Sequence, residues 1–379
     1  MFYFDNAATG GRKPDSVLSA LSSAVKVCAN VGRGGHKLSL SCAAVTQSCR
    51  NTLNDFFGGF GYDRVVFTKN CTEALNIAIL GVLKKGDHVV TTAMEHNSVL
   101  RALEFLKKSG VITYDVCSLQ GEVQDGNAYL SPTDITNLLQ PNTRMVIITT
   151  ASNVTGYNPD IRAIKKALPR RVLLLCDGAQ GAGHLGIKMQ DWGIDILTIA
   201  GHKGMQGIQG SGALLFSERV DPMPILYGGT GSMSLSLNMP DFYPDALEAG
   251  TLSYPAIVSL LEGTRYMDAH VKQVQSRLLM LTSYFLSGLR ALKKYKIYSK
   301  ANPCGIVAFA HPTLPSEHLA SVLSIKYDIA VRGGLHCAPL MHEALGTIDN
   351  GLVRASFSHF NSEKEIDKLL QALNELSLE

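Results

Sequence analysis

The stretch that decides the fold runs from residue 172 to residue 204 and reads VLLLCDGAQGAGHLGIKMQDWGIDILTIAGHKG. It contains two short apolar runs, 172–176 and 194–200, and polar residues follow each run at once. Runs that are apolar at nearly every position are typical of strands buried on both faces of a parallel sheet. We therefore expect two strands of one buried sheet, with Asp177 and Lys203 just beyond their carboxyl ends.

The same alternation extends over residues 65–217. Short Val- and Ile-rich runs predict five further strands, at 65–68, 88–94, 111–116, 145–150 and 212–216. Apolar residues at helical spacing predict helices over 72–85 and 97–108, and each ends in Lys-Lys followed by Gly or Ser-Gly, a helix C-terminal signal. Strands that alternate with helices predict an α/β fold with a mostly parallel, doubly wound, seven-stranded sheet in a large domain.

The pattern changes after about residue 254 and predicts a smaller α+β domain. A long helical region over about 255–294 comes first. It is followed by shorter elements at 305–310, about 317–325, 329–332 and 352–357, and by a terminal helix from residue 362. We expect a large domain at 15–255 and a small domain made of 1–14 and 256–379.

Composition and charge exclude several classes of protein. Hydrophobic residues make up 46% of the chain, which is enough for a core and excludes intrinsic disorder. The 35 Lys and Arg residues nearly balance the 32 Asp and Glu residues, so a dedicated nucleic-acid binder or a polybasic membrane protein is not expected. The apolar run 172–176 falls far short of the roughly 20 residues that cross a bilayer.

The first residues and the cysteines indicate a cytoplasmic protein. The chain begins MFYFDN, without the basic region of a secretory signal. Its eight cysteines form no CxxC pair and no regular spacing, so most are expected to be small buried apolar residues rather than disulfide partners.

Polar side chains follow four of the predicted strands. Asp177 and Gln180 follow one strand, Lys203 the next, His96 the strand at 88–94, and Asn153 the strand at 145–150. Because ligands of open α/β sheets bind beyond the carboxyl ends of the strands, we expect these side chains to share a site.

Two other kinds of site are rejected. Residues 181–186 fit GxGxxG, but a dinucleotide site also needs an acid at the end of the next strand, where Lys203 stands instead. His336, Cys337 and His342 lack regular ligand spacing and a fourth ligand, so no metal site is expected.

Lys203 and Asp177 together indicate a site for pyridoxal 5′-phosphate. A single lysine at a strand end usually extends into solvent, but a buried amine with a lowered pKa can bond an aldehyde. The neighbouring carboxylate of Asp177 suits the ring nitrogen of this cofactor, which must stay protonated to accept electrons. His96 could lie flat on the ring, and Asn153 and Gln180 could donate to its phenolic oxygen.

The turn at 68–74 leads from a strand into a helix and could bind the cofactor's phosphate. Backbone N–H groups at a helix N-terminus and the Thr72 hydroxyl are suitable donors. The alternative is ordinary capping of this helix by Asn70 or Thr72.

Ten stretches, in family order and spread over nearly the whole chain, resemble the class V aminotransferase-fold family of cysteine desulfurases and selenocysteine lyases. They are YFDNAAT at 3–9, RGGHKLS at 33–39, TEALN at 72–76, EHN at 95–97, SNVTG at 152–156, DGAQ at 177–180, GHK at 201–203, EAGT at 248–251, VRGGLHCA at 331–338 and VRAS at 353–356.

The resemblance implies the fold of the type I pyridoxal 5′-phosphate-dependent transferases and a role for each matching residue. The cofactor would be held by Lys203, Asp177, Gln180, His96, Asn153, Cys71, Thr72, His202 and, from the other subunit of a homodimer, Thr251. The substrate would be bound by Arg354, Arg332, Asn6 and His36, and the catalytic residues would be Lys203, His96 and the sulfur-accepting Cys337.

The activity that the resemblance implies is conversion of L-cysteine to L-alanine, with a persulfide left on Cys337 for transfer to an acceptor. The acceptor could be a carrier protein, an iron–sulfur scaffold or a small thiol. Alternatives are a selenocysteine lyase, another lyase or epimerase in which Cys337 is incidental, and a catalytically silent scaffold.

The short loop at 332–337 resembles the group II, SufS-like branch, but three residues depart from the usual pattern. Ala200 stands where relatives often carry a Ser, Cys71 replaces a Thr or Ala, and Leu335 replaces a frequent His. Because a thiol is a weak donor, Cys71 is expected to weaken the phosphate contacts.

Overall fold

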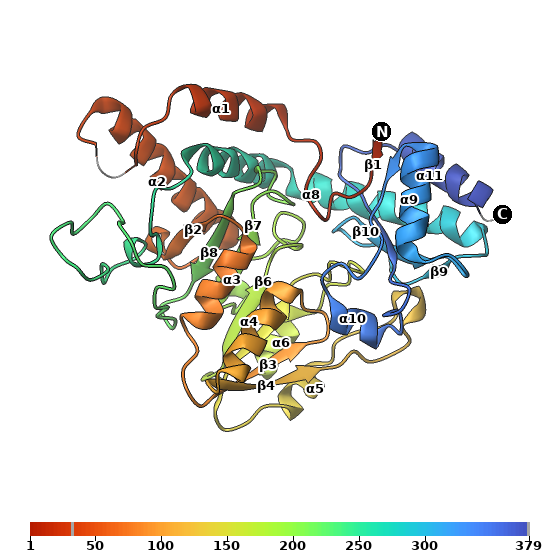
Figure 1. The fold of residues 1–379 in the computed structure, drawn as a ribbon, viewed down its shortest axis with the longest axis horizontal. Helices are drawn as coiled ribbons and strands as arrows, with labels where there is room; N and C mark the ends of the chain where they lie inside the picture. The colour runs from red at the N-terminus through yellow and green to blue at the C-terminus, as the bar shows by residue number, and fades with distance from the viewer. Residues whose placement is uncertain (32–33, 377–379) are drawn as a thin grey trace.

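The computed structural model describes residues 1–31 and 34–376, and a seven-stranded sheet lies at its centre (Figure 1). The strands are β2 (Val65–Thr68), β3 (Asp87–Thr92), β4 (Ile112–Cys117), β5 (Thr143–Thr149), β6 (Leu173–Asp177), β7 (Ile196–Ala200) and β8 (Gly212–Phe216). Their order is β2-β8-β7-β6-β5-β3-β4, and all neighbours are parallel except β8, which is antiparallel to β2 and β7. The mostly parallel, seven-stranded α/β sheet predicted from the sequence is confirmed.

Both faces of this sheet are buried, as the apolar runs predict. In β6, Leu173 and Leu175 belong to one hydrophobic core, and Leu174 and Cys176 belong to the core on the other face. Successive side chains of a strand point to opposite faces, so a strand between two cores must be apolar throughout. Helices α3 (Cys71–Leu80) and α4 (Asn97–Lys108) cover the first face. The second is covered mainly by α2 (Lys37–Phe57), α6 (Ile161–Ala167), α7 (Met189–Trp192) and the start of α8 (Tyr254–Ala291).

Helix α3 is shorter than predicted, because it ends at Leu80 rather than at residue 85. The carbonyl of Gly81 accepts a hydrogen bond from the backbone N–H of Met223 at 2.9 Å instead of from the next turn of a helix. A Cβ at Gly81 would lie 2.4 Å from the Met223 carbonyl oxygen, so this close approach requires glycine. A contact with a distant segment therefore ends the helix.

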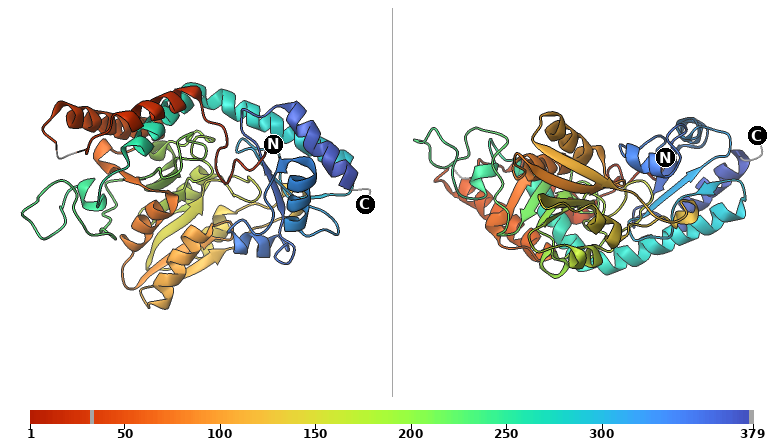
Figure 2. Two further views of the ribbon diagram at one scale, coloured as in Figure 1. Left: turned by 45° about the horizontal axis from the view of Figure 1, so that its top comes forward. Right: turned by 90° about the horizontal axis from the view of Figure 1, so that it is seen from below.

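The long helix α8 connects the central sheet to a second group of elements, and it runs along one side of the molecule (Figure 2). That group contains a three-stranded sheet of β12 (Val353–Ser356), β10 (Ile306–Ala310) and β9 (Lys296–Ile297). Its helices are α9 (Ser316–Tyr327), α10 (Pro339–Ala344) and α11 (Glu363–Leu376). The predicted helices and strands of this region are present, whereas β9 and α10 were not predicted.

The N-terminal segment joins the two groups of elements. Strand β1 (Phe2–Tyr3) pairs in parallel with β11 (Ile329–Ala330), and Asp5 then forms a bridge with Ser356 at the end of β12. The chain continues into α1 (Asp15–Lys26), which packs with α2 on α8. Residues 5–13 are thereby placed between the two sheets. Among the described residues, the one remaining α-helix is α5 (Pro132–Asn137).

Residues 1–31 and 34–376 contain neither a helix suited to cross a membrane nor a cluster of metal-ligating side chains. No helix among residues 1–31 and 34–376 is long and apolar enough to cross a membrane. In the same part of the chain, no cluster of three or more His, Cys, Asp or Glu side chains has the arrangement of a metal site.

Candidate active site

A cavity lies at the carboxyl ends of the central strands, where the sequence predicts a site. The strands β3, β5, β6 and β7 are neighbours in the parallel part of the sheet, so the residues that follow them meet at one edge. Residues from all four strand ends line the cavity with the start of α3: Asn70, Cys71, Thr72, Leu75, His96, Ser98, Thr149, Asn153, Asp177, Ala179, Gln180, Ala200, His202 and Lys203.

Asp177 and Lys203 supply the acid and the amine of this cavity. Asp177 is 2% exposed, and its Oδ1 accepts hydrogen bonds from the backbone N–H of Ala179 at 2.8 Å and from the Cys71 thiol at 3.4 Å. Desolvation lowers the pKa of Lys203 from its ordinary value, although the negative charge of Asp177 acts in the opposite direction. An amine with a lowered pKa is a better nucleophile toward an aldehyde.

His96 stands between β3 and α4, and its ring is fixed by the start of that helix. The backbone N–H of Ser98 donates to His96 Nδ1 at 3.0 Å, so the imidazole carries its proton on Nε2. Desolvation lowers the pKa of His96. The Ser98 hydroxyl lies 2.9 Å from the same Nδ1 and 2.8 Å from the Thr72 hydroxyl, and it thus connects two predicted site residues. Ser98 was not predicted; its only sequence signal is its place two residues after His96 at a helix start.

The N-terminus of α3 forms one wall of the cavity and is capped by its own residues. Asn70 Oδ1 accepts from the Glu73 N–H at 2.9 Å, and Glu73 Oε2 accepts from the Lys69 N–H at 2.6 Å, which is a reciprocal capping arrangement. The Thr72 side chain takes no part in this capping and faces Ser98 instead. Capping and an anion site are therefore compatible at this turn.

Residues of the N-terminal segment fix the position of His202 through hydrogen bonds. Its Nδ1 lies 3.1 Å from the Thr9 hydroxyl, and its carbonyl oxygen accepts from Lys13 Nζ at 2.9 Å and from the Gly10 N–H at 3.0 Å. Burial, with Lys203 and Lys13 nearby, lowers the pKa of His202 to about 4, so the ring is neutral near pH 7. If Thr9 donates to Nδ1, the ring proton is on Nε2, where it can be donated to a ligand.

These groups fit pyridoxal 5′-phosphate. A buried carboxylate suits the ring nitrogen, a desolvated amine suits the aldehyde, and a helix N-terminus with hydroxyl and imidazole donors suits the phosphate. All of them line one cavity, so the chemistry of the donor set matches the parts of this cofactor.

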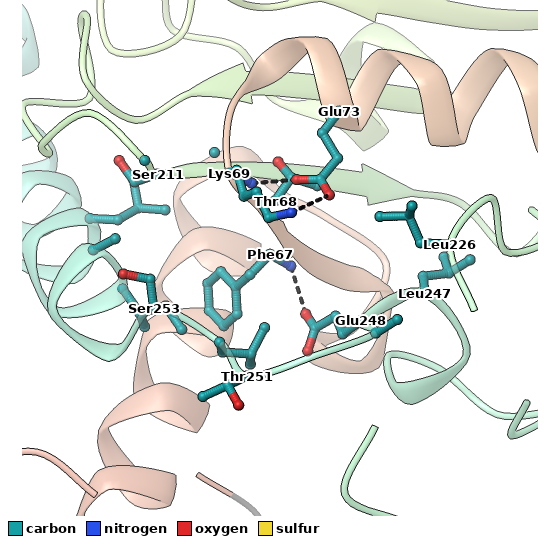
Figure 3. Close-up of a pocket in the computed structure, with 17 residues that line it drawn as sticks. Phe67, Thr68, Lys69, Glu73, Ser211, Leu226, Leu247, Glu248, Thr251 and Ser253 are labelled. Atoms are coloured by element: carbon teal, nitrogen blue, oxygen red, sulfur yellow. Dashed lines mark hydrogen bonds and ion pairs between the residues drawn. The ribbon is translucent and has the colours of Figure 1, made fainter. Parts of the chain in front are cut away.

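Thr251 and His36 lie outside this cavity in the single chain. Thr251 is exposed and lines a second pocket with Phe67, Lys69 and Glu248 (Figure 3). His36 is also exposed, and its Nδ1 accepts from the Ser39 N–H at 3.3 Å as the cap of α2. Arg33, part of the stretch at 33–39, lies outside the described residues.

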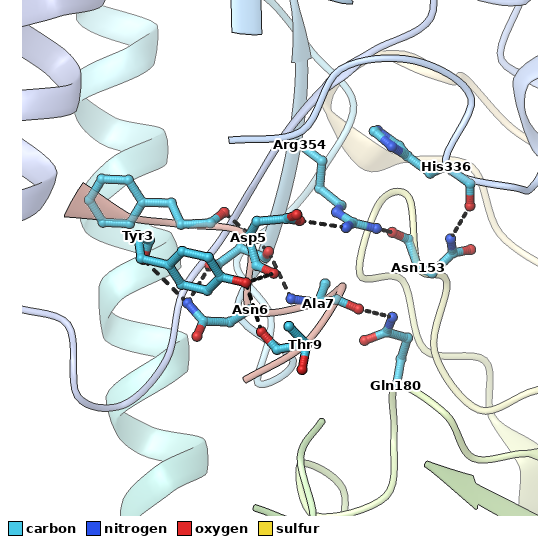
Figure 4. A network of polar contacts seen from close by, with 11 residues as sticks. Tyr3, Asp5, Asn6, Ala7, Thr9, Asn153, Gln180, His336 and Arg354 are labelled. Atoms are coloured by element: carbon cyan, nitrogen blue, oxygen red, sulfur yellow. Dashed lines mark hydrogen bonds and ion pairs between the residues drawn. The ribbon is translucent and has the colours of Figure 1, made fainter. Parts of the chain in front are cut away.

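Arg354 lies at the centre of a buried polar network beside the cavity (Figure 4). It is 2% exposed, its Nη2 donates to Asp5 Oδ1 at 2.9 Å, and its Nη1 donates to the Asn153 carbonyl oxygen at 2.9 Å. Its Nε is buried and has no hydrogen-bond partner among residues 1–31 and 34–376. A buried N–H without a hydrogen-bond partner lowers the stability of the fold, so this guanidinium is suited to donate hydrogen bonds to a further anionic group.

The side-chain amides of Asn153 and Gln180 donate to the backbone. Asn153 Nδ2 donates to the His336 carbonyl oxygen at 2.7 Å, and Gln180 Nε2 donates to the Ala7 carbonyl oxygen at 2.9 Å. Each amide group has a second hydrogen for a ligand. Asn6 has a comparable anchoring role, because its Nδ2 donates to the Ser356 carbonyl oxygen at 2.9 Å. Asn6 and Lys203 also line a second, smaller cavity.

The loop that carries Cys337 is fastened at both ends to the site. Arg332 forms a backbone bridge with Arg354, and the Cys337 carbonyl oxygen accepts from the Asn97 N–H, next to His96, at 2.7 Å. Cys337 is exposed, and both it and His336 have left-handed backbones, with φ of 57° and 50°. Such φ values are unfavourable for residues other than glycine and are frequent at functional sites.

The Cys71 side chain does not point toward the α3 cradle as predicted. Its Sγ lies 3.4 Å from Asp177 Oδ1 and 3.3 Å from Thr198 Oγ1, against the ends of β6 and β7. Cys71 is the first residue of α3. Helical side chains tilt toward the N-terminus of their helix, and this tilt directs the Cys71 side chain against the sheet. The thiol therefore contacts the acid of the site rather than the cradle.

Comparisons with known proteins agree with this geometry. The sequence profile of the family described as Aminotransferase class-V matches residues 2–369. A probable cysteine desulfurase of Pyrococcus abyssi is 30% identical over 389 residues, which are 99% of this chain and 94% of the relative. One of Methanothermobacter thermautotrophicus is 31% identical over 386 residues, with 99% and 94% covered.

Solved structures give the same result. The apo structure of a cysteine desulfurase from Thermococcus onnurineus has a TM-score of 0.88 and 31% identity, covering 100% of this chain and 94% of that one. A cysteine desulfurase of Escherichia coli is 24% identical with a TM-score of 0.85, covering 100% and 94%, and it shows the fold alone. The chain belongs to the class V aminotransferase family, among its cysteine desulfurases, and its cofactor is pyridoxal 5′-phosphate.

Proposed function

We propose that this chain is a cysteine desulfurase that converts L-cysteine to L-alanine and keeps the released sulfur as a persulfide on Cys337. One observation carries this proposal: an exposed cysteine stands on a loop that is hydrogen-bonded to Asn97, the neighbour of His96, and bridged to Arg354. A cysteine held there can reach the sulfur of a substrate bound in the cavity.

The lining of the cavity supports the following cofactor contacts. Lys203 would bond the aldehyde, Asp177 would pair with the ring nitrogen, His96 would contact the ring, and Thr72 and His202 would hold the phosphate. The bound cofactor supplies an electron sink for bond changes at the substrate's carbons. The free amine of Lys203, with its lowered pKa, takes the Cα proton of the substrate.

Arg354 binds the carboxylate of the substrate. Its Nε, which has no partner among the described residues, and the second hydrogens of its Nη atoms give the planar fork that a carboxylate requires. Arg332 forms a backbone bridge with Arg354 and assists at the mouth of the site. L-selenocysteine has the same carboxylate and amine and would bind in the same way.

Sulfur transfer then takes place at Cys337. The Cys337 thiolate attacks the substrate sulfur, a sulfur–sulfur bond forms, and the bond between Cβ and sulfur breaks. The electron pair of the broken bond stays with carbon, which takes up protons and leaves as alanine. No external oxidant is required, since the persulfide keeps the oxidation equivalent until a thiol acceptor removes the outer sulfur.

We further propose a homodimer in which Thr251 of each chain completes the phosphate site of the other. Large apolar side chains are exposed, among them Val25 of α1 at 63% and, in the segment that leads to Thr251, Leu235 at 103% and Leu237 at 105%. An apolar groove between α1, α2 and α8 includes Tyr254, three residues after Thr251. Exposed apolar surface of this extent is typical of a subunit interface.

The compartment and the branch of the family complete the proposal. All eight cysteines are free thiols, which fits the reducing cytoplasm. The short loop at 332–337 fits the group II branch, and the domains would be residues 15–255 and the remainder of the chain. The sulfur acceptor is a thiol of a protein or of a small molecule.

The test compares Cys337→Ala with Cys28→Ala, which removes the other exposed cysteine. We expect Cys337→Ala to keep the yellow cofactor and to lose both alanine formation from cysteine and the added sulfur seen by mass spectrometry. Cys28→Ala should keep both alanine formation and the added sulfur. Unchanged alanine formation by Cys337→Ala would remove Cys337 from the mechanism, and turnover of selenocysteine alone by the wild type would indicate a selenocysteine lyase.

A further inference from the structure

The Cys71 thiol is part of a buried three-residue contact under the cofactor cavity. Its Sγ lies 3.4 Å from Asp177 Oδ1 and 3.3 Å from Thr198 Oγ1. Cys71 is 7%, Asp177 2% and Thr198 0% exposed. Asp177 and Thr198 are register partners on β6 and β7, so the first residue of α3 packs on both strand ends at once.

The donors in this contact can be assigned. A thiol has one hydrogen, and an ionised carboxylate has none, so the Cys71 S–H donates to Asp177 and the Thr198 hydroxyl donates to the sulfur. Burial raises the pKa of Cys71 well above its ordinary value, with the charge of Asp177 as the second cause, so the thiol keeps its proton.

In the part of the chain that the structure describes, two hydrogen bonds reach the Asp177 carboxylate, and they end on the same oxygen. Oδ1 accepts from the Ala179 N–H and from the Cys71 thiol. Two donors on one oxygen fix the rotation of the carboxyl group, and they leave Oδ2 for the protonated ring nitrogen of the cofactor.

We propose that Cys71 is a positioning residue that orients Asp177 toward the cofactor and, as a weak donor, withdraws little charge from it. The proposal rests on the role of Asp177 in the proposed function. A stronger donor would draw more of the carboxylate charge toward Oδ1, which would weaken the interaction of the carboxylate with the protonated ring nitrogen. A thiol at this position therefore favours the protonated ring, the form that accepts electrons.

The test measures binding of 4-deoxypyridoxine 5′-phosphate to the apoprotein. This probe has the ring nitrogen and the phosphate of the cofactor but no aldehyde, so Lys203 cannot bond it, and its ultraviolet absorption reports whether the ring is protonated. We expect Cys71→Ala to weaken binding about 5-fold, the effect of one lost hydrogen bond. Cys71→Ser should restore the affinity, but its bound ring should lose the proton at a lower pH than in the wild type.

Cys176→Ala is the matched control. Cys176 is as deeply buried and precedes Asp177, but its side chain belongs to the core on the other face of the sheet. This variant also loses a buried thiol, but not one that contacts the Asp177 carboxylate. Its affinity for the probe and the titration of the bound probe ring should therefore equal those of the wild type.

Several results would overturn the proposal. Cys71→Ala could bind the probe as tightly as the wild type, or Cys71→Ser could fail to restore the affinity. If Cys71→Ala does not fold, Cys71→Ser still decides, because a ring titration identical to that of the wild type contradicts the role. Failure of the wild type to bind the probe would also overturn it. Probe binding does not depend on Cys337, so a desulfurase assay that fails while the probe results hold removes only the proposed function.

Discussion

Asp5 Oδ1 lies 2.9 Å from Arg354 Nη2 and forms an ion pair with the guanidinium proposed to bind the substrate carboxylate. The Arg354 side chain is 2% exposed and that of Asp5 22%, so solvent screens the pair only weakly. Asp5 holds Arg354 in place and at the same time competes with the substrate for its positive charge.

We predict that Asp5→Asn separates these two effects. Asparagine keeps an oxygen acceptor for Arg354 but removes the competing charge, so the KM for L-cysteine should fall by about 3- to 10-fold. The loss of a buried charge partner should lower the free energy of unfolding by about 3 kcal/mol. Steady-state kinetics and urea unfolding measure the two effects.

The control for this prediction is Asp328→Asn. Asp328 pairs with the N-terminal amine at 2.5 Å on the surface, where both groups are more than half exposed. This variant should change neither KM nor stability appreciably. An unchanged KM in Asp5→Asn would mean that Asp5 does not compete with the substrate.

Glu95 makes stability depend on pH. It is 0% exposed, its Oε1 accepts from the Thr92 hydroxyl at 2.6 Å and the Thr149 N–H at 3.0 Å, and its Oε2 has no partner among the described residues. Burial raises its pKa from 4.5 to about 8. Between these two pH values the folded protein keeps a proton that the unfolded chain has lost, so Glu95 makes the protein less stable as the pH rises.

Glu95→Gln should remove this dependence, because an amide resembles the protonated acid at every pH. We predict that Glu95→Gln gains stability relative to the wild type between about pH 5 and about pH 8, measured as Tm at several pH values. The exposed Glu375→Gln is the control and should follow the wild type. Parallel curves for Glu95→Gln and the wild type would show that Glu95 is ionised in the folded state.

Arg50 and Glu248 form a buried ion pair. Glu248 lines the same pocket as Thr251 and faces the backbone N–H of Phe67 (Figure 3). Arg50 Nη2 lies 2.6 Å from Glu248 Oε2, the two side chains are 7% and 6% exposed, and Glu248 Oε1 also accepts from the Phe67 N–H at 2.6 Å. Removal of one partner leaves the other charge buried and unpaired. Glu248→Met should lower the free energy of unfolding by about 3–5 kcal/mol.

The double variant Arg50→Met, Glu248→Met tests the origin of this loss. Without either charge, the double variant should be less destabilised than the sum of the two single variants, as urea unfolding can measure. Simple additivity would show that the pair does not stabilise the protein through its charges.

Thr9→Val should weaken cofactor binding without changing the shape of the side chain. The Thr9 hydroxyl lies 3.1 Å from His202 Nδ1. By donating to Nδ1, it would keep the imidazole proton of His202 on Nε2, where the proton can be donated to the phosphate. We predict that the apoprotein binds pyridoxal 5′-phosphate about 5-fold more weakly, measured by fluorescence titration.

A surface pair provides the control for Thr9. Thr313 and His311 form the same kind of contact, with Thr313 Oγ1 3.2 Å from His311 Nδ1, on an exposed turn. Thr313→Val should leave cofactor affinity unchanged. Equal affinity in both variants would mean that Thr9 does not orient His202.

Local sequence patterns predicted most of the elements. The seven central strands were recognisable because strands between two cores must be apolar at nearly every position. The predicted end of α3 was wrong, because Met223 binds the Gly81 carbonyl and no local signal encodes that contact. The two-residue strand β9 is too short to give a pattern.

The sequence by itself determined the sheet and the placement of Asp177, Lys203 and His96 at its edge, because apolar runs and strand ends are local features and parallel strands end together. Only the tertiary structure decided which side chains meet there. Asp5 and Arg354 are 349 residues apart, Thr9 and His202 are 193 apart, and Cys71 and Asp177 are 106 apart. Such contacts depend on the path of the whole chain and on the direction of each side chain, and neither leaves a periodic trace in the sequence.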